Sequence, residues 1–337
     1  MTLYSDNKRV NMNNYLKIIK YYFDLIRYFI FKNKYPEEWG EQFARHEKTT
    51  AKKVVFMCDG FKRHGGFTDR MKGCLTTYVE AKRHKLPFFI NWTDPFNLNE
   101  FLVPSGECDW RIDPHKISYN YADSFPVIMD ISPTHGKNVI KKFIFKYSFI
   151  GRRDILVYSN MMYVKKDRPK LYHELFKPSD YLQQNIDLHL NNIGTNYWSY
   201  TFRFGNYLGD FRDIIGYPLE ETEKMRLVNK NIEELKRMLK DLPKEFKALV
   251  TSDSLFFLKH VEKADDRIYI VKEKLMHMDF YKKEENKKKI WLKSFLDLYL
   301  IMRSQRVFLL RTEGMYKSSF PAFAALLGGA EFVYHEF

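Results

Sequence analysis

The chain has 337 residues, 45% of them hydrophobic and 29% charged; this composition excludes a disordered chain, and the length favours two domains over one. The formal net charge of +14 suggests an anionic partner: nucleic acid, an acidic membrane surface or a phosphate-bearing small molecule. The three cysteines, Cys58, Cys74 and Cys108, lack the spacing of metal ligands and support neither a disulfide framework nor a zinc site.

An N-terminal extension, residues 1–50, contains one predicted helix at residues 15–31. This helix is apolar except for a narrow stripe of charged residues: Lys17, Lys20, Asp24 and Arg27. The stripe fits two alternatives, a helix docked on the body of the protein or a helix lying on a membrane surface. Neither a run of 18 uncharged apolar residues nor a secretory signal occurs in the sequence. We therefore expect a cytoplasmic protein, with peripheral membrane contact through residues 15–31 left open.

Strand and helix patterns alternate from residue 53 onward. Apolar, β-branched runs at 53–58 and 87–92 predict two buried strands. The helix between them begins near Thr68, its predicted cap, and has one buried face at helical spacing: Met71, Cys74, Leu75, Tyr78 and Val79. This βαβ unit opens a first domain at residues 51–190, which we expect to bind the acceptor, mainly through residues 93–150.

The alternation continues with a strand at 154–161 and a helix at 180–193, capped by Ser179 and followed by Gly194. Further strands are predicted at 198–204, 247–253, 267–271, 306–311 and 332–337, and further helices at 219–242, 254–264, 291–304 and 319–328. Strands that alternate with helices predict parallel sheets. We therefore expect an α/β protein with two facing Rossmann-like αβα domains, the second at residues 191–337.

Ligands of such sheets bind outside the carboxyl ends of the strands. This rule selects the loops after Cys58, Phe202, Val250 and Leu310. In the first loop, Gly65 and Gly66 either let a ligand approach the backbone or form a tight turn. The loop matches neither the GxGxxG nor the P-loop pattern.

The second loop begins with Arg203, followed by Gly205. A guanidinium at a strand end suits bidentate contact with a phosphate. The alternative is an ion pair with a nearby carboxylate such as Asp210, and the pattern does not separate these two roles.

Polar residues also open the helices that follow two later strands. Asp253 and Ser254 are placed to cap the first helix, alone or while also facing a ligand. Ser318 and Ser319 open the second, where free backbone N–H groups and two hydroxyls form a phosphate site or an ordinary cap.

Asp297 lies inside an apolar helix, where a buried carboxylate needs a partner. One candidate is a purine base that offers an N–H and an amino group. The alternatives are an ion pair with Lys293, one turn earlier, or an exposed carboxylate.

In this order, the motifs resemble those of the GDP-fucose-dependent fucosyltransferases, a superfamily that includes α1,2, α1,6 and protein O-fucosylating enzymes. "YTFRFGN" (200–206) resembles H-x-R-x-G-[DN], and residues 295–329 resemble the last motif, in which an aspartate precedes a helix and a strand before S-S-F opens a helix. Residues 176–186 resemble the segment that joins the domains, and residues 65–92 the first βα unit. The resemblance covers roughly residues 53–335 and implies a GT-B fold.

The resemblance also implies roles for individual residues. Arg203 would bind the β-phosphate and support the departure of GDP, Ser319 and the backbone of Phe320 would hold the same phosphate, and Asp297 would recognise guanine. The remaining donor contacts would be Gly205, Asp253, Ser254 and Ser318, and the residues facing the sugar or acceptor would be Gly66, Asp69 and Arg70. The chain departs from the pattern at Thr201, where the family has histidine.

The implied reaction is an inverting, metal-independent transfer of a sugar, fucose from GDP-fucose, to a glycan hydroxyl, as in polysaccharide biosynthesis. Four carboxylates are candidates for the base by position: Asp69, Asp94, Asp210 and Glu313. The alternatives are a transferase with another nucleotide sugar, a non-catalytic glycan-binding protein and a polyanion-binding protein. Nucleic acid is not an expected partner, because the lysines are spread along the chain rather than clustered in a known module.

Overall fold

The computed structural model describes most of the chain from residue 52 onward. The described ranges are 52–119, 123–129, 149, 153–162, 164, 167–213, 216–273, 275–279, 281, 288–312 and 314–337. The predicted N-terminal extension, with its helix at 15–31, and the candidate base Glu313 lie outside these ranges. Within them, none of the helices combines the length and the apolar character needed to cross a membrane.

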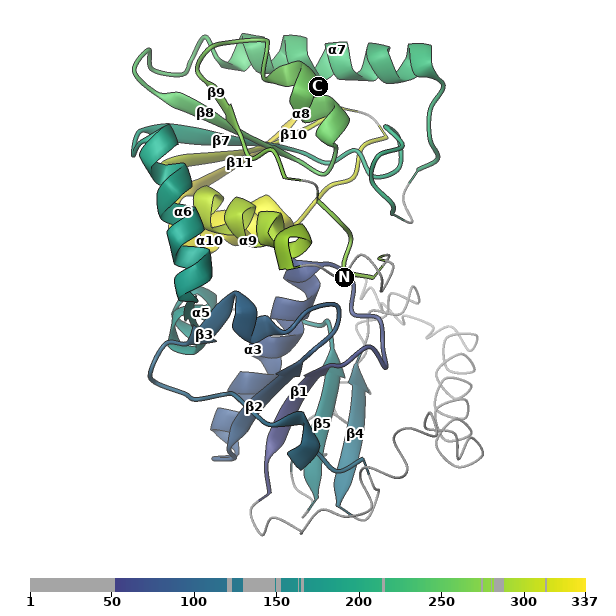
Figure 1. Cartoon of the computed structure of the whole chain (residues 1–337), viewed down its shortest axis with the longest axis vertical. Coiled ribbons are helices and arrows are strands. Elements are labelled where there is room, and N and C mark those ends of the chain that lie inside the picture. Colours follow the sequence, from purple (N-terminus) through teal and green to yellow (C-terminus); the bar gives the residue numbers. More distant parts are fainter. Residues whose placement is uncertain are drawn as a thin grey trace, which may run out of the picture.

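A parallel sheet of four strands forms the lower part of the molecule in Figure 1, called here the four-stranded half. Its strand order is β2-β1-β5-β4, with the bounds β1 (Val54–Cys58), β2 (Phe88–Trp92), β4 (Ser124–Met129) and β5 (Asp154–Ser159). The strands predicted at 53–58, 87–92 and 154–161 are confirmed. Strand β4 lies in the stretch 93–150, where the pattern predicts no strand.

Helix α3 (Phe67–Arg83) joins β1 to β2. Its N-cap is Gly66, so the prediction that Thr68 caps it is wrong, and Thr68 lies in the first turn. The helix packs closely on β5, because a Cβ atom at Gly73 would lie 1.8 Å from the Ser159 carbonyl oxygen. Only glycine permits this approach, which fixes the start of α3 at the carboxyl edge of the sheet.

A second parallel sheet, of five strands, forms the upper part of the molecule, called here the five-stranded half (Figure 1). Its order is β11-β10-β7-β8-β9, with the bounds β7 (Tyr197–Phe202), β8 (Lys247–Ser252), β9 (Ile268–Ile270), β10 (Arg306–Arg311) and β11 (Glu331–Glu336). All five strands are predicted by the sequence. Four helices cover the two faces: α7 (Glu221–Met238), α8 (Leu255–Val261), α9 (Lys288–Met302) and α10 (Phe320–Gly328). Helices α9 and α10 lie between the two sheets, and α7 and α8 lie on the outer face.

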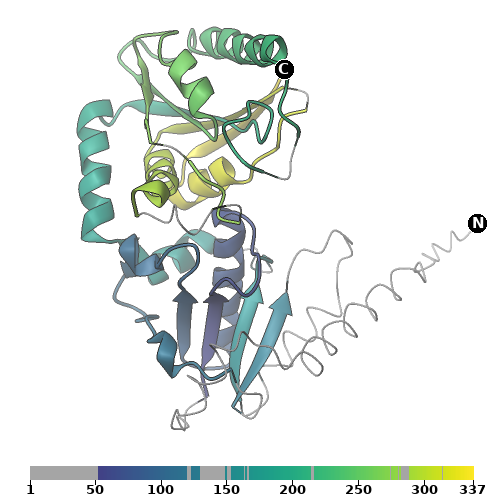
Figure 2. The same cartoon turned by 45° about the vertical axis from the view of Figure 1, so that its right-hand side comes forward.

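Segments outside the two sheets form a small antiparallel pair of strands, two short 3-10 helices and two α-helices. Their bounds are η1 (Leu98–Glu100), β3 (Leu102–Pro104), η2 (Pro114–Lys116), α5 (Arg168–Leu175), β6 (Phe176–Pro178) and α6 (Asp180–Ile193). Helix α6 runs along one side of the molecule and links the halves (Figures 1 and 2). As predicted, the Ser179 hydroxyl caps α6 by accepting from the Leu182 N–H at 3.3 Å, and Gly194 ends it with φ of 83°.

The hydrophobic core is continuous between the two halves. Phe295 of α9 stacks on Phe101, with ring centroids 4.4 Å apart, and packs edge-on against Phe67 of α3 at 5.1 Å. Such aromatic pairs contribute about 0.5–1.5 kcal/mol each beyond their burial. The division of the chain at residues 190 and 191 stays a prediction, and the packing joins the two sides of that division into one core.

Candidate active site between the two sheets

A cavity of about 390 Å³ lies between the halves, at the carboxyl ends of the strands. Each of the four loops selected from the sequence contributes to its wall: residues 63 and 65–69, then 203, 211 and 213, then 251–253, and finally 316 and 318–320. Thr201 and Phe202 of β7, residues 275–279 after β9, and Ser294 and Asp297 of α9 complete the lining. The strand-end rule therefore locates the cavity correctly from sequence alone.

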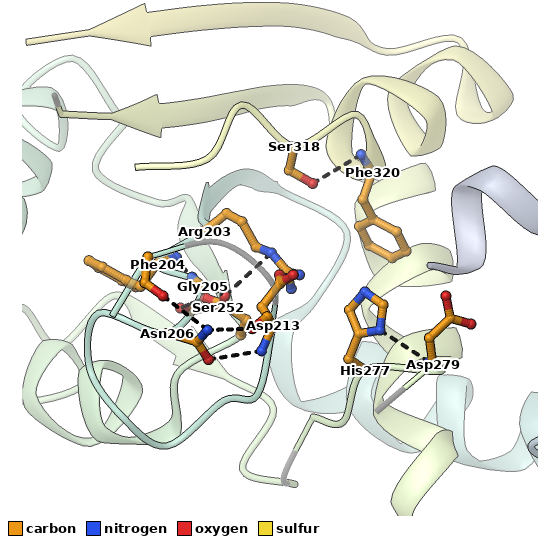
Figure 3. Close-up of polar contacts among 12 residues, drawn as sticks. Arg203, Phe204, Gly205, Asn206, Asp213, Ser252, His277, Asp279, Ser318 and Phe320 are labelled. Carbon is orange, nitrogen blue, oxygen red and sulfur yellow. Dashed lines mark hydrogen bonds and ion pairs between the residues drawn. The ribbon is translucent and has the colours of Figure 1, made fainter. Parts of the chain in front are cut away.

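Arg203 lines this cavity and is held in place by two carboxylates (Figure 3). Its Nη2 lies 2.5 Å from Asp213 Oδ2, and its Nε lies 3.4 Å from Asp253 Oδ2. The guanidinium also stacks over the Phe211 ring at 4.4 Å. The sequence alternative of an ion pair is thus observed, but with Asp213 and Asp253 rather than with Asp210. The side chain remains 17% exposed, so the ion pairs do not remove it from the cavity.

The loop after β7 is folded by backbone groups that bind Asp253 and Asn206. Asp253 accepts hydrogen bonds from the backbone N–H groups of Phe204 at 2.9 Å and Gly205 at 2.8 Å. Gly205 has φ of 62°, a backbone conformation that residues with a Cβ atom rarely adopt. This conformation accounts for the glycine at this turn. Asn206 accepts from the Asp213 N–H at 2.9 Å and thereby brings Asp213 back towards Arg203.

Asp253 is a buried carboxylate at the base of the cavity wall. Burial raises its pKa, while the Arg203 guanidinium and the two backbone N–H donors act in the opposite direction. A buried carboxylate needs such contacts to compensate for its removal from water, and Asp253 has three of them: one guanidinium and two backbone N–H groups. Asp253 therefore orients Arg203 and the glycine turn, and it also lines the cavity, where a ligand-facing role is compatible with this contact set.

Ser254 has the capping role that the sequence offered as one alternative. Its hydroxyl accepts from the Phe257 N–H at 3.1 Å at the start of α8 and donates to Asp210 Oδ2 at 3.1 Å. Asp210 in turn accepts from the Phe256 N–H at 2.7 Å. Among the described residues, the cavity lining includes Asp253 but neither Ser254 nor Asp210. The hydroxyl is thus used by the helix, and a contact of Ser254 with the donor stays a prediction.

The start of α10 faces the cavity with Ser318, Ser319 and Phe320 (Figure 3). The Ser318 hydroxyl accepts from the Phe320 N–H at 3.2 Å, while Ser319, the N-cap residue, makes no side-chain cap bond. Instead, the Ser319 hydroxyl accepts from Lys72 Nζ of α3 at 3.2 Å. The positive end of a helix and two hydroxyls thus line one wall of the cavity, and the Lys72 ammonium group is bound to one of these hydroxyls.

Asp297 is buried in α9 and lines the cavity. Its Oδ1 accepts from Lys293 Nζ at 2.9 Å, and both side chains are almost fully enclosed. Burial raises the pKa of Asp297, and the neighbouring ammonium opposes that rise. Of the sequence alternatives, the exposed carboxylate is excluded and the Lys293 ion pair is observed. Because Asp297 also lines the cavity, the ion pair and contact with a ligand are compatible.

The loop after β1 contributes Gly66 and Asp69 to the cavity but not Arg70. Arg70 is 2% exposed and donates to Asp279 Oδ1 at 2.8 Å, to the Asp94 carbonyl at 3.0 Å and to the Gly65 carbonyl at 3.2 Å. Within the described chain, Arg70 is outside the cavity lining. The fold uses its guanidinium, in the first turn of α3, to bind the segment after β9, and a contact of Arg70 with the sugar or acceptor stays a prediction.

Asp69 is the base candidate that the structure brings to the cavity. Its Oδ1 accepts from Lys72 Nζ at 2.8 Å, and its side chain is 35% exposed. Asp210 is bound to the start of α8, and Asp94 accepts a hydrogen bond from the Tyr281 hydroxyl. Of the four carboxylates proposed by position, Asp69 is the described one that lines the cavity.

Three residues of the site were missed in the sequence: Asp213, His277 and Asp279. His277 and Asp279 lie in residues 272–289, which read as a polar, lysine-rich connection with no periodicity to fix their position. Burial and the nearby Arg203 lower the pKa of His277, while Asp213 and Asp279 raise it. In the sequence, His277 stands out only as an isolated histidine in this connection, and such a histidine does not by itself identify a functional site.

Comparison with solved structures places this arrangement in a known fold. The chain is similar to NodZ alpha-1,6-fucosyltransferase soaked with GDP-fucose, with a TM-score of 0.52, 16% identity and coverage of 82% of this chain and 92% of that one. Fucosyltransferase NodZ from Bradyrhizobium gives the same TM-score at 15% identity, covering 82% and 93%. A mutant of Arabidopsis thaliana FUT1 in complex with GDP gives 0.52 at 12% identity, covering 95% and 78%. No family model matches the sequence, and no curated protein matches it.

The fold is therefore that of a GT-B-like α/β protein, with two parallel sheets flanked by helices as in fucosyltransferase structures. The structural match to GDP-fucose fucosyltransferases agrees with the resemblance of the sequence motifs. At 12–16% identity the match concerns the fold, and the chemistry of this chain has to be argued from its own cavity.

Proposed function

We propose that the protein is an inverting glycosyltransferase that transfers fucose from GDP-fucose to a hydroxyl group of a glycan. The observation that carries the proposal is the pairing of Arg203 with the start of α10 on two walls of one cavity. A guanidinium and a helix N-terminus are both suited to a diphosphate. The fold supports the same class of reaction, since fucosyltransferase structures share it.

Arg203 is suited to stabilise the leaving group. A guanidinium has five N–H donors, and the contacts with Asp213 and Asp253 involve Nη2 and Nε. It can therefore bind a phosphate while the two carboxylates keep it oriented. Negative charge grows on the diphosphate as the bond to the sugar breaks, and donors fixed in advance stabilise that charge more than they stabilise the bound substrate.

The proposed reaction is a single displacement at the anomeric carbon. The acceptor oxygen forms the new bond to that carbon, and the bond from the carbon to the β-phosphate oxygen breaks, with its electron pair leaving on GDP. The acceptor hydroxyl loses its proton to the Asp69 carboxylate, which lines the cavity on the four-stranded half. In this proposal the contacts to the diphosphate come from protein groups, and no metal ion takes part.

Asp297 is the proposed guanine contact. A carboxylate accepts hydrogen bonds, and guanine offers two donors side by side, the ring N–H and the exocyclic amino group. Adenine has no ring N–H beside its amino group, so one carboxylate cannot accept from it in the same way. Each hydrogen bond to a charged group contributes about 1.5–3 kcal/mol, which is enough to select among nucleotides.

A thermal-shift panel with GDP, UDP and ADP, in buffer containing a chelator, tests the proposal. We expect GDP to raise the melting temperature most, because a ligand that binds only the folded state stabilises it. Asp297→Asn should abolish the preference for GDP. The double variant Lys293→Met with Asp297→Asn is the matched control, since it removes the ammonium group that the single variant leaves unpaired.

Other outcomes of the panel point to the alternative functions. A larger shift with UDP than with GDP would contradict the role of Asp297 and favour a transferase that uses another nucleotide sugar. Binding of GDP without any transfer of sugar to glycan acceptors would favour a non-catalytic glycan-binding protein. Affinity for RNA that falls steeply with salt, without any nucleotide effect, would favour a polyanion-binding protein.

A further inference from the structure

We propose that His277 binds the diphosphate of the nucleotide through its Nε2–H group, as a neutral hydrogen-bond donor. The inference rests on the proposed function, because it assigns a new contact to the ligand of the same cavity. It concerns a residue outside the sequence motifs, on the segment at 275–279 that follows β9. That segment contributes to the cavity wall beside the start of α3, to which Asp279 is hydrogen-bonded.

The position of His277 places its ring beside the phosphate-binding groups. The ring lines the cavity together with Arg203 and lies 6.1 Å from the Phe211 ring, in an edge-on arrangement. Phe211 is also the ring over which the Arg203 guanidinium stacks, at 4.4 Å. Figure 3 shows the imidazole between Arg203 and Asp279, with one ring nitrogen turned towards the space that separates Arg203 from Phe320.

The hydrogen bond to the other ring nitrogen fixes the position of the proton. The backbone N–H of Asp279 donates to His277 Nδ1, with a distance of 3.1 Å between the two nitrogens. A nitrogen that accepts a hydrogen bond cannot carry a proton itself, so the proton of the neutral ring is on Nε2. Nε2 is the nitrogen turned towards the space between Arg203 and Phe320 (Figure 3).

The surroundings of the ring favour this neutral form. Burial lowers the pKa of His277, and the positive charges of Arg203 and Arg70 lower it further, against the opposite effect of Asp213 and Asp279. Protonation of Nδ1 would also break the hydrogen bond from the Asp279 N–H. A neutral imidazole with its proton on Nε2 donates there and cannot accept. The arrangement therefore suits binding of an anion and does not suit a general base at Nε2.

The segment that carries His277 is anchored to the four-stranded half. The Asp279 carboxylate accepts from the Gly65 N–H at 2.7 Å and from Arg70 Nη2 at 2.8 Å. These two contacts fix the residue whose backbone N–H holds the ring. The Nε2–H group is therefore oriented before a ligand enters, and an oriented donor binds a developing charge without a cost of reorganisation.

Two substitutions separate donation from proton abstraction. His277→Ala removes the ring, whereas His277→Gln replaces Nε2–H by an amide N–H and has no basic group. We would measure the binding of GDP, guanosine and inorganic pyrophosphate to the full chain by calorimetry, with wild type and both variants. We expect His277→Ala to weaken the binding of GDP and pyrophosphate about tenfold or more and to leave that of guanosine unchanged. His277→Gln should restore most of the affinity.

The transfer reaction gives the second measurement. With GDP-fucose as donor, we expect His277→Ala to lower kcat about 10²-fold, as loss of one donor to a developing oxyanion does. His277→Gln should recover most of this loss. Equal loss of turnover in both variants, with unchanged binding of GDP, would identify a proton acceptor and overturn the inference.

Failure of the inference is distinguishable from failure of the proposed function. Wild-type affinity for GDP and pyrophosphate in His277→Ala would overturn the role of His277 and leave the transferase in place. A second outcome is that the wild type binds UDP more tightly than GDP and that His277→Ala weakens the binding of UDP tenfold. This outcome would overturn the assignment of guanine and support the histidine contact. Absence of binding of any of these diphosphates to the wild type would overturn both.

Discussion

The segments that follow β1 and β7 are built alike but use their arginines differently. Each follows a strand of a parallel sheet, and each contains a glycine at positive φ, Gly65 at 83° and Gly205 at 62°. Arg70, in the first turn of α3, is 2% exposed and donates to the Asp279 carboxylate and to the carbonyl groups of Asp94 and Gly65. Arg203 is held by two carboxylates and is 17% exposed at the cavity. The first arginine joins the halves of the molecule, and the second is available to a ligand.

This difference shows that the position of an arginine after a strand does not by itself determine its role. The strand-end pattern identifies Arg203 in the sequence, whereas Arg70 is identified there only through the family resemblance. The role of each arginine depends on how many of its donors the fold itself uses, which is decided by residues far away in the chain, such as Asp279 for Arg70 and Asp213 for Arg203.

The largest expected effect is that of Arg203→Ala on turnover. We expect kcat to fall about 10³-fold or more, the range of an arginine that stabilises a phosphate leaving group. The measurement is transfer from GDP-fucose at saturating donor. Because the substitution leaves Asp213 and Asp253 without their cation, the control is Arg203→Ala combined with Asp213→Asn, checked for folding by circular dichroism. Turnover within tenfold of wild type would contradict the assignment.

Arg70→Met should affect stability rather than chemistry directly. The Asp279 side chain is 9% exposed and would lose its cationic partner. Breaking a buried ion pair from one side costs about 3–5 kcal/mol in the free energy of unfolding. Urea denaturation measures this loss. Arg70→Met with Asp279→Asn should recover a large part of it, and a loss below about 1 kcal/mol in the single variant would mean that the ion pair does not join the halves.

Asp69→Asn should lower turnover while leaving binding of the donor intact. Removal of a general base lowers kcat by about 10²-fold or more. The KM for GDP-fucose should stay within a factor of a few of the wild-type value. Lys72→Met is the matched control, because it removes the partner of Asp69 at 2.8 Å but keeps the carboxylate. Equal turnover in Asp69→Asn and wild type would assign the acceptor proton to another group.

The smallest expected effect concerns His64, in the loop after β1. Burial lowers the pKa of His64 to about 3, and its Nδ1–H donates to the Ser159 carbonyl at 3.3 Å. Between this pKa and the ordinary value near 6.5, the unfolded chain binds a proton that the folded chain does not, so stability falls as pH is lowered through this window.

At pH 5 the contribution of His64 amounts to at most about 2 kcal/mol relative to pH 7.5, because protonation of the unfolded state limits it. Urea unfolding at the two pH values should show a larger decrease for wild type than for His64→Gln, which does not titrate. Equal decreases would indicate that the imidazole is not held neutral by the fold.

The elements that form the sheets could be predicted because their patterns are local. Nine strands in two parallel sheets are described, and eight of them come from predicted apolar runs. Strand β4 was missed, since it lies in a region of weak alternation between residues 93 and 150. The strand-end rule located the cavity because it needs only the order of strands and loops.

The contacts inside the site could be predicted only in part. Ser254 and Asp253 form one strand end, and the sequence does not decide which hydroxyl or carboxylate is used by the helix. His277 is fixed by a backbone N–H two residues away and by an anchor at Arg70. Such contacts depend on tertiary packing between distant segments, which leaves no periodic trace in the sequence.

The packing of α9 and α10 between the two sheets has a practical consequence for protein engineering. Under the proposed function, exchange of the predicted nucleotide-sugar-binding domain would require a cut near residue 190, but Phe295 of α9 packs on Phe67 and Phe101 from the other side of that cut. A chimera joined there would combine two aromatic surfaces that were not selected together. If Asp297 has the proposed guanine contact, donor specificity is therefore better transplanted by substituting individual side chains, such as Asp297 and Lys293, than by exchanging a whole domain.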